Sequence, residues 1–521
     1  MLLLYVPLTI LVGVVGFYLT SWIQEIQYRR TCKKYNCAPA YMYPNKWMGM
    51  DILLESFKRA AQHDYLEYTR SLMEKPNKKT IRVNVLGNVA IQTTDPQNVK
   101  AILATQFKEY DLGLKHLQMF PLLGHGIFTL SGDGWHHSRS LLRPQFANDQ
   151  ITGFDGIKKH TDLLIELFKH KSARGKDFDV QPLFLELTMD TSTEYLYGSG
   201  TETLSAEFDD NEEETEGQRF AEAFAIAGTW CFKRALASRL YFLVTSKEFR
   251  DALKLCQEYV DRHVYRALEV AEERDRREKA GEEKTESERY VFLYELTKQT
   301  RDPVLMRDQS LNVLLAGKDT TGGVLTYSIG MLLRYKRVWN KLRAVVLETF
   351  GKNTDEITFS NLKKCEYLRC FINEVLRLYP SVPVNSRSSI MNTTLPRGGG
   401  PDETEPVYVP KGTNIVYSTY AMHRSKDLWG EDADEFRPER WLENKTIPWS
   451  YIPFSGGPRI CLGQQFALTE ASFVIVRLLQ EFKDVVSDDD LTKNNGAIAQ
   501  EVALASFSAH GVHARFVEDD T

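Results

Sequence analysis

The sequence predicts a mainly helical protein with a small β region, preceded by one N-terminal transmembrane helix. Three observations predict this fold class: an uncharged apolar run opens the chain, helical spacing of apolar residues dominates the remainder, and strand patterns cluster in a short stretch before the last strong helix. Composition agrees, because 43% hydrophobic and 26% charged residues among 521 are typical of a globular chain. They exclude a disordered, collagen-like or polytopic membrane protein.

The apolar run covers residues 2–23, which are 22 residues without a charge. As a helix it would be about 33 Å long, enough to cross a hydrocarbon core of about 30 Å. No basic side chain precedes the run, whereas four follow it closely: Arg29, Arg30, Lys33 and Lys34. This charge bias favours a single-pass anchor with the body of the protein in the cytoplasm, and the membrane that we expect is that of the endoplasmic reticulum. A cleaved signal peptide is disfavoured, because no A-x-A site follows the run.

We therefore expect three segments: a transmembrane signal anchor over residues 1–23, a tether over residues 24–50, and a single domain over residues 51–521. The formal net charge of −5 offers no basic surface for nucleic acid, so we expect no nucleic-acid partner. Seven cysteines are too few and too scattered for a disulfide scaffold, which fits a reducing compartment.

Three helices and two strands are the clearest elements of the body. Apolar residues repeat at three- and four-residue spacing from 311 to 333, a second helix covers 367–379 and stops at a proline, and a third follows Gly463. Strand patterns at 407–409 and 414–417 flank a Pro-Lys-Gly turn. The body is therefore predicted to be mostly helical with a small β region.

The strongest local signal is the sequence FSGGPRICLG at residues 454–463, directly before the third helix. Its glycines allow tight bends, so that backbone N–H groups can point at the sulfur of Cys461. The start of the helix and Arg459 are expected to lower the pKa of the thiol. A thiolate held in this way can be an axial ligand of heme iron. The ten residues resemble the heme-binding signature F-x-x-G-x-R-x-C-x-G of the cytochrome P-450 family of heme-thiolate monooxygenases.

A second motif of that family is similar to AGKDTTGG at residues 316–323 of the long helix. Three glycines and two threonines are poor helix formers, which predicts a kink. The resemblance implies that Asp319 and Thr320 are catalytic and carry protons to dioxygen through water. The pair Gly322–Gly323 stands where Ala-Gly is more usual in the family.

The contacts to the heme propionates are implied by a third resemblance. Trp135 and Arg139 match the W-x-x-x-R helix of the family, and residues four apart share a helix face, so an indole N–H and a guanidinium can meet one carboxylate. Arg387 and Arg459 match the other propionate contacts of the family.

A fourth motif is structural. Glu374 and Arg377 resemble the E-x-x-R motif and can pair on one helix face, and Arg440 in FRPERW would complete a buried charge triad that braces the cysteine loop.

The resemblance covers nearly the whole chain and implies the cytochrome P-450 fold, a heme b cofactor and Cys461 as the metal ligand. It also implies electrons from NADPH through a diflavin reductase and an apolar small-molecule substrate. The segments LGHGIFTLSGDGWHHSRSLLRPQF and NEVLRLYPSVPVNSR look like the fungal alkane- and fatty-acid-hydroxylating group, which implies hydroxylation at or near the end of a long chain.

Three alternatives remain open at this point. A tailoring oxidase for a fungal polyketide or other lipid-like metabolite would carry the same motifs. A reductase-independent heme-thiolate isomerase or dehydratase is disfavoured by the intact pair Asp319–Thr320. A non-catalytic lipid- or heme-binding protein would bind heme without turnover.

Overall fold

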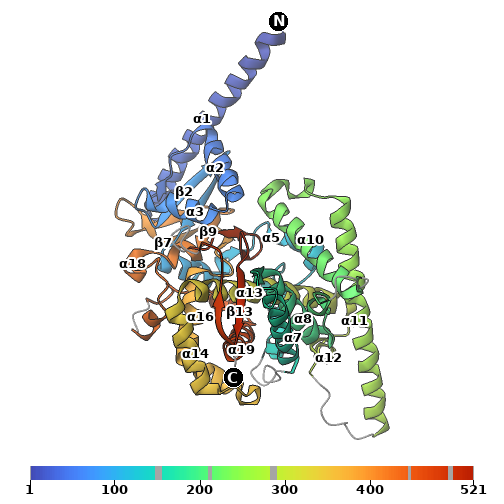
Figure 1. The fold of residues 1–521 in the computed structure, drawn as a ribbon. Helices are drawn as coiled ribbons and strands as arrows, with labels where there is room; N and C mark the ends of the chain where they lie inside the picture. The colour runs from blue at the N-terminus through green and yellow to red at the C-terminus, as the bar shows by residue number, and fades with distance from the viewer. Residues whose placement is uncertain are drawn as a thin grey trace. The chain divides into compact units, whose positions relative to one another are not determined.

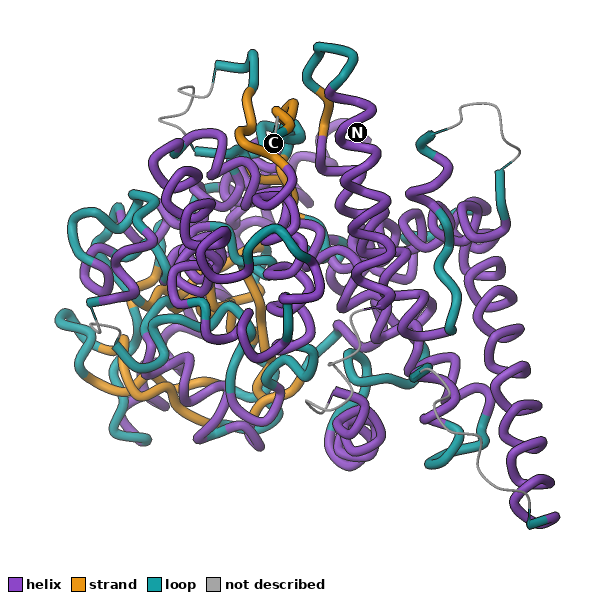
Figure 2. The backbone as a smooth tube through the Cα atoms, turned by 60° about the horizontal axis from the view of Figure 1, so that its bottom comes forward, coloured by secondary structure: helices purple, strands orange, loops and turns teal. Residues whose placement is uncertain are grey.

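The computed structural model describes residues 2–146, 155–208, 214–281, 290–443, 447–490 and 497–519. The chain forms two compact units. The first holds residues 1–113, 383–435 and 446–460, and the second holds residues 114–382, 436–445 and 461–521. Helix accounts for most of the described backbone (Figure 2), as the sequence predicts.

The first unit contains most of the described strands. Its helices are α1 (Leu2–Lys34), α2 (Met50–Ala61), α3 (Tyr65–Glu74), α4 (Pro96–Lys100), α17 (Thr419–Met422) and α18 (Lys426–Trp429). Its strands are β1 (Tyr41–Met42), β2 (Thr80–Val85), β3 (Asn88–Thr93), β4 (Tyr110–Asp111), β6 (Val384–Ser389), β7 (Thr393–Gly399), β8 (Glu405–Val409) and β9 (Asn414–Ser418). The order β1-β2-β3-β9-β6-β4 makes one sheet, and β7 pairs with β8 in another. Both predicted strands therefore form, but β8 and β9 lie in different sheets.

The C-terminal part of α1 packs on this unit. The Tyr28 hydroxyl donates to the Tyr408 carbonyl at 3.0 Å, and the Arg82 guanidinium lies 3.7 Å from the centre of the Tyr28 ring. Arg82 also pairs with Glu25 at 3.0 Å. The helix thus continues through residue 34 into the stretch predicted as a tether, and β1 within that stretch pairs with β2.

Across the part of the chain that the structure describes, we find no helix that combines the length and the apolarity of a membrane span.

The second unit is mainly helical. Its helices are α5 (Lys115–Leu123), α6 (Gly132–Leu142), α7 (Asp155–Ser172), α8 (Val180–Tyr197), α9 (Thr203–Ala206), α10 (Glu216–Leu236), α11 (Lys247–Ala280), α12 (Phe292–Leu296), α13 (Pro303–Arg334), α14 (Lys336–Phe350), α15 (Phe359–Lys364), α16 (Glu366–Leu378) and α19 (Gln464–Glu481). Its strands are β5 (Phe178–Asp179), β10 (Phe482–Val486), β11 (Gln500–Val502), β12 (Ser506–Ser508) and β13 (His513–Glu518). Strands β10, β13 and β5 form one sheet, and β11 pairs with β12.

Helix α13 is the central element of this unit and lies beside α8 (Figure 1). It starts with a proline at its first position, where the missing N–H costs nothing, and Asp302 caps it by accepting from the N–H groups of Val304 and Leu305. Apolar side chains of α10, α11 and α12 pack with those of α13 in one buried cluster. The next predicted helix is α16, which ends at Leu378, before Pro380, as expected.

The glycines of α13 serve close packing, within a helix that is continuous from Pro303 to Arg334. A Cβ atom on Gly322 would lie 2.9 Å from a Leu185 methyl group and 3.1 Å from the Phe184 carbonyl oxygen of α8. A Cβ atom on Gly317 would lie 3.0 Å from the Ser192 hydroxyl. The glycines therefore let α8 approach α13 closely. The same contacts explain why glycine stands at 322 instead of the more usual alanine.

Candidate functional site

The loop that carries Cys461, residues 454–463, bends where the sequence places glycine. Gly457 opens the short 3₁₀ helix Gly457–Arg459 at φ 66°, and a Cβ atom there would lie 1.9 Å from the Leu103 carbonyl oxygen. Only glycine fits this position. After Cys461 the chain turns into α19, whose first residue is Gln464.

Cys461 differs from the other cysteines of the chain. It is exposed, whereas Cys32, Cys37, Cys231, Cys256, Cys365 and Cys370 are buried. Burial by the surrounding protein nevertheless raises the pKa of its thiol, while the N–H of Gly463, which donates to the sulfur, and the charge of Arg139 oppose that rise. Cys461 is thus exposed as a residue, although the protein around its sulfur partly desolvates it.

The predicted lowering of the Cys461 pKa by Arg459 is therefore wrong for the protein alone. Desolvation exceeds the effect of the N–H donor, and the cation that acts on the sulfur is Arg139 of α6. The predicted N–H donor is confirmed, because Gly463 supplies it.

Trp135 and Arg139 share a face of α6, as predicted. The guanidinium carbon of Arg139 lies 5.8 Å from the centre of the Trp135 ring, and the Trp135 side chain is buried. Burial lowers the pKa of Arg139, and the positive charge of Arg143 lowers it further. Cys461 acts in the opposite direction and raises it. Ser138, between them, donates to Gln309 of α13 at 2.7 Å and so fixes α6 against the central helix.

Asp319 and Thr320 lie near the middle of α13, among hydrogen bonds to its carbonyl groups. The Thr320 hydroxyl donates to the Ala316 carbonyl at 2.7 Å, and the Ser381 hydroxyl donates to the Thr320 carbonyl at 3.2 Å. The Asp319 carboxylate is paired with Lys318 at 2.7 Å. Bonding of a threonine hydroxyl back to the preceding turn is common in helices, so this geometry alone assigns no catalytic role.

The other two predicted site residues belong to the first unit. Arg387 is buried in β6, where it donates to the Ser386 carbonyl at 2.8 Å. Arg459 ends the 3₁₀ helix that precedes Cys461.

Heme fits the donor set around Cys461. An accessible sulfur that already accepts an N–H can ligate iron as the thiolate, and a hydrogen bond to the sulfur tunes the metal–sulfur bond. The partly desolvated guanidinium of Arg139 offers the charge-assisted hydrogen bonds that a carboxylate such as a propionate requires.

The predicted charge triad is confirmed. Arg377 donates twice to Glu374, each time at 2.9 Å, and both side chains are 0% exposed. Arg440 donates to the same carboxylate at 2.9 Å. Sequence reasoning missed two further donors, the Trp441 indole at 3.0 Å and the Arg437 backbone N–H at 2.9 Å. The carboxylate therefore accepts five hydrogen bonds, which satisfies a charge that would otherwise be costly to bury.

Sequence reasoning also missed Glu470, which lies in α19 and is 2% exposed. Its carboxylate accepts from the Thr191 hydroxyl of α8 at 2.5 Å, and burial raises its pKa to about 7. A glutamate on the apolar face of a helix is the only sequence signal that could have identified it.

Glu470 predicts a pH dependence of stability. The folded protein keeps this proton up to about pH 7, whereas the unfolded chain loses it near 4.5, so the free energy of unfolding falls as pH rises between these values. The loss is on the order of 3 kcal/mol. Glu470→Gln keeps an acceptor for Thr191 and removes the titration. We expect the variant to equal the wild type at pH 4.5 and to be more stable at pH 8, measured by denaturant unfolding; equal stability at both pH values would contradict this.

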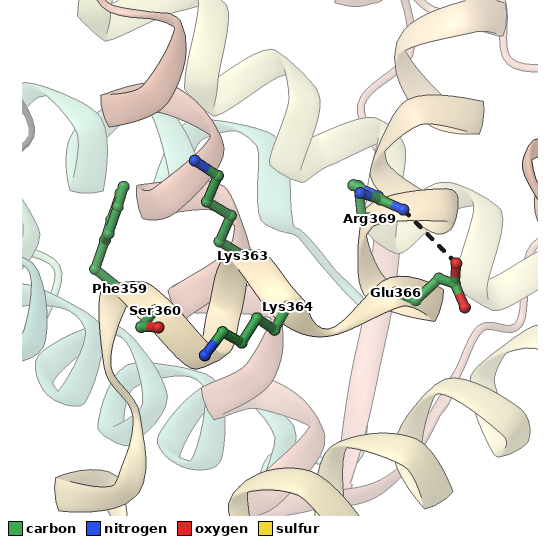
Figure 3. A pocket seen from close by; sticks show the side chains of 6 residues that line it. All are labelled: Phe359, Ser360, Lys363, Lys364, Glu366 and Arg369. Atoms are coloured by element: carbon green, nitrogen blue, oxygen red, sulfur yellow. Dashed lines mark ion pairs between the residues drawn. The ribbon is translucent and has the colours of Figure 1, made fainter.

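A separate hollow of about 740 Å³ lies on α15 and α16. Figure 3 shows Lys363 beside Phe359 on α15, and Arg369 of α16 paired with Glu366. Ser360 and Lys364 complete its lining, and none of the predicted site residues takes part.

Comparisons with known proteins agree on one family. The sequence model of the family described as cytochrome P-450 matches residues 44–504. Cytochrome P-450 52A12 of Debaryomyces hansenii is 44% identical over 492 residues, covering 92% of this chain and 92% of the relative. Cytochrome P-450 52A4 of Candida maltosa is 47% identical over 425 residues, covering 80% of this chain and 77% of the relative.

Among solved structures, the crystal structure of the cytochrome P-450DA heme domain aligns with a TM-score of 0.74 and covers 93% of this chain and 98% of that one. At 20% identity this likeness shows the fold alone. It confirms the fold that the sequence motifs predict.

Proposed function

The chain belongs to the cytochrome P-450 family, and on that premise we propose that it is a heme-thiolate monooxygenase that hydroxylates long-chain alkanes or fatty acids at or near the chain end. The observation that carries the proposal is Cys461, the one exposed cysteine of the chain, which accepts the Gly463 N–H in the loop that matches the family's heme signature. Product analysis by mass spectrometry, with alkanes and fatty acids of graded length, tests the substrate class and the position of hydroxylation.

We propose heme b as the cofactor, with Cys461 as the iron ligand. Trp135 and Arg139, adjacent on one face of α6, are suited to one propionate. Arg387 and Arg459 are proposed to bind propionates as well, since both stand at positions that match the propionate contacts of the family. When bound, heme supplies the activation of dioxygen that allows one oxygen atom to enter a C–H bond.

The chain's own contribution to that chemistry is the supply of protons. Asp319 is proposed to take up protons and pass them toward the Thr320 hydroxyl. That hydroxyl has to turn from the Ala316 carbonyl, which it now contacts, to serve as a donor elsewhere. A rotation about one side-chain bond is sufficient.

Asp319→Asn is expected to slow product formation about 10²-fold, because the variant keeps the shape of the side chain and loses the carboxyl group that can take up and release a proton. NADPH oxidation is expected to continue, so less of it yields product. Both rates are measured on the same sample. Thr297→Val, at a threonine outside the motif, serves as the control and is expected to leave the ratio unchanged. A normal ratio of product to NADPH in Asp319→Asn would contradict the proton role.

Membrane association is proposed from two observations. Residues 2–23 carry no charge, which supports a single-pass anchor in the endoplasmic reticulum membrane with a cytoplasmic body. In the second unit, Leu240, Phe242 and Leu243 are 58%, 61% and 67% exposed, and no acidic residue occurs between Lys233 and Lys247. Exposed apolar side chains next to basic ones are typical of contact with a lipid interface. An apolar substrate would also concentrate in that membrane.

The proposed electron donor is an NADPH-dependent diflavin reductase. The hollow on α15 and α16 carries Lys363, Lys364 and Arg369, which would suit an acidic surface of a partner (Figure 3). Reconstitution with and without reductase tests the proposal. Product formed from a hydroperoxide, with no requirement for NADPH, would instead favour an isomerase or dehydratase.

A further inference from the structure

Three buried polar side chains of α13 hold the loop between α5 and α6, residues 124–131. They are Asp308, Gln309 and Asn312, which are 4%, 0% and 0% exposed. Each of them forms a hydrogen bond to a backbone group of this loop. We call these three residues the α13 clamp. Because they bind the backbone, they fix the path of the chain.

Asp308 and Gln309 hold residue 125 at both of its backbone groups. The His125 N–H donates to the Asp308 carboxylate at 2.7 Å, and the Gln309 side-chain amide donates to the His125 carbonyl at 3.1 Å. Gln309 in turn accepts from the Ser138 hydroxyl of α6 at 2.7 Å. A Cβ atom on Gly124 would overlap the Asp308 carboxylate, so glycine is what lets the loop pass this close to α13.

Asn312 bridges the start and the end of the same bend. Its side-chain amide donates to the Leu123 carbonyl at 2.8 Å, and its carbonyl oxygen accepts from the Phe128 N–H at 3.1 Å. An amide that donates and accepts at once fixes both strands of the bend. A Cβ atom on Gly126 would overlap the Asn312 side chain. Loop and side chain are therefore matched in shape as well as in hydrogen bonding.

The clamp lies beside the motif that carries the proposed proton supply. Asn312 and Asp319 are seven residues apart, about 20° short of two turns, so they share a face of α13 at about 10 Å along its axis. Ile127 of the loop packs against the buried cluster that contains Leu315, one turn before Asp319. Phe128, whose N–H is held by Asn312, is 39% exposed. The loop thus presents an apolar ring from a fixed backbone, near the place of the proposed reaction.

We propose that the α13 clamp sets which carbon of the substrate is hydroxylated, with Asn312 as its main positioning residue. The inference rests on the proposed function, the hydroxylation of a long alkyl chain. Burial of methylene groups binds such a chain without selecting its position, because the groups are alike. Selection of one carbon therefore needs a wall that does not move. A loop held at several backbone groups supplies such a wall, whereas a loose loop would admit the chain at several depths.

Asn312→Ala removes both hydrogen bonds between this side chain and the bend. The ratio of the main hydroxylation product to its positional isomers is expected to fall about fivefold, measured by mass spectrometry with one alkyl substrate. This ratio does not depend on how much of the enzyme is active. The matched control is Ser310→Ala on the same helix. Ser310 is buried and its hydroxyl donates to the Met306 carbonyl of α13 at 2.8 Å, so the ratio is expected to stay unchanged.

Gly126→Ala tests the same contact from the side of the loop. Its methyl group would meet the Asn312 side chain and is expected to lower the isomer ratio as well. In Asn312→Ala the obstacle is gone, so the addition of Gly126→Ala is expected to cause no further fall. Falls that simply multiply in the double variant would show that the two residues act separately, and would overturn the proposal.

Amide hydrogen exchange measures the hold on the loop without turnover. Protection of the loop is expected to drop about tenfold in Asn312→Ala and to remain in Ser310→Ala, both without substrate. Unchanged protection in Asn312→Ala would contradict the proposal. If Asn312→Ala does not take up heme, Asn312→Ser, which is too short to reach both backbone groups, replaces it with the same expectations.

The outcomes separate the inference from the function beneath it. A wild type that forms product with NADPH and reductase, together with an unchanged isomer ratio in Asn312→Ala, overturns the role of the clamp alone. Equal changes in Asn312→Ala and Ser310→Ala overturn it too, because a general loosening of α13 would explain both. A wild type with no reductase-dependent product overturns the proposed function and the inference together.

Discussion

Cys461→Ala is expected to reduce NADPH-dependent product formation to background. The substitution removes the one exposed thiol of the chain and with it the proposed iron ligand. Little packing is lost at an exposed side chain, so the thermal unfolding midpoint of the heme-free protein is expected to change little. Product is measured by mass spectrometry and folding by circular dichroism.

The matched control is Cys256→Ala, which removes a buried thiol of α11. Activity per bound heme is expected to remain in this variant, although some stability is lost with the packing. A Cys461→Ala protein that still forms product from NADPH would show that another residue ligates the iron.

Glu374→Ala is expected to have the largest effect on stability. The substitution leaves two arginines, Arg377 and Arg440, without the carboxylate that both bind, and these side chains are almost fully buried. Removal of one partner from a buried ion pair costs about 3–5 kcal/mol. We expect little folded protein and a failure to retain heme, measured by denaturant unfolding and by heme content.

The control for this effect lies on the same helix. Glu366 of α16 pairs with Arg369 at 3.7 Å, and both side chains are more than 60% exposed. Glu366→Ala is therefore expected to cost no more than about 1 kcal/mol. Equal losses of stability in the two variants would mean that the charge cluster around Glu374 does not brace the fold.

The parts of the site that could be predicted from sequence depend on short, fixed spacings. Trp135 and Arg139 meet because residues four apart share a helix face, and Glu374 reaches Arg377 for the same reason at a spacing of three. The glycines of the cysteine loop are needed by the backbone itself, as Gly457 shows. In these cases local geometry leaves few alternatives.

Other features depend on which elements pack together, which the sequence does not state. The glycines of α13 accommodate α8, a contact between residues more than a hundred positions apart. A charge that lowers the pKa of Cys461 comes from Arg139, on a helix far away in the sequence, and desolvation outweighs it. The buried Glu470 depends on the contact of α19 with Thr191 of α8.

The most direct test of the proposed cysteine-ligated heme is the carbon-monoxide difference spectrum of the reduced, heme-loaded wild-type protein. The account predicts the band of a thiolate-ligated heme, with Cys461 as the ligand. A band typical of a nitrogen-ligated heme, obtained from protein shown to be folded, would contradict it.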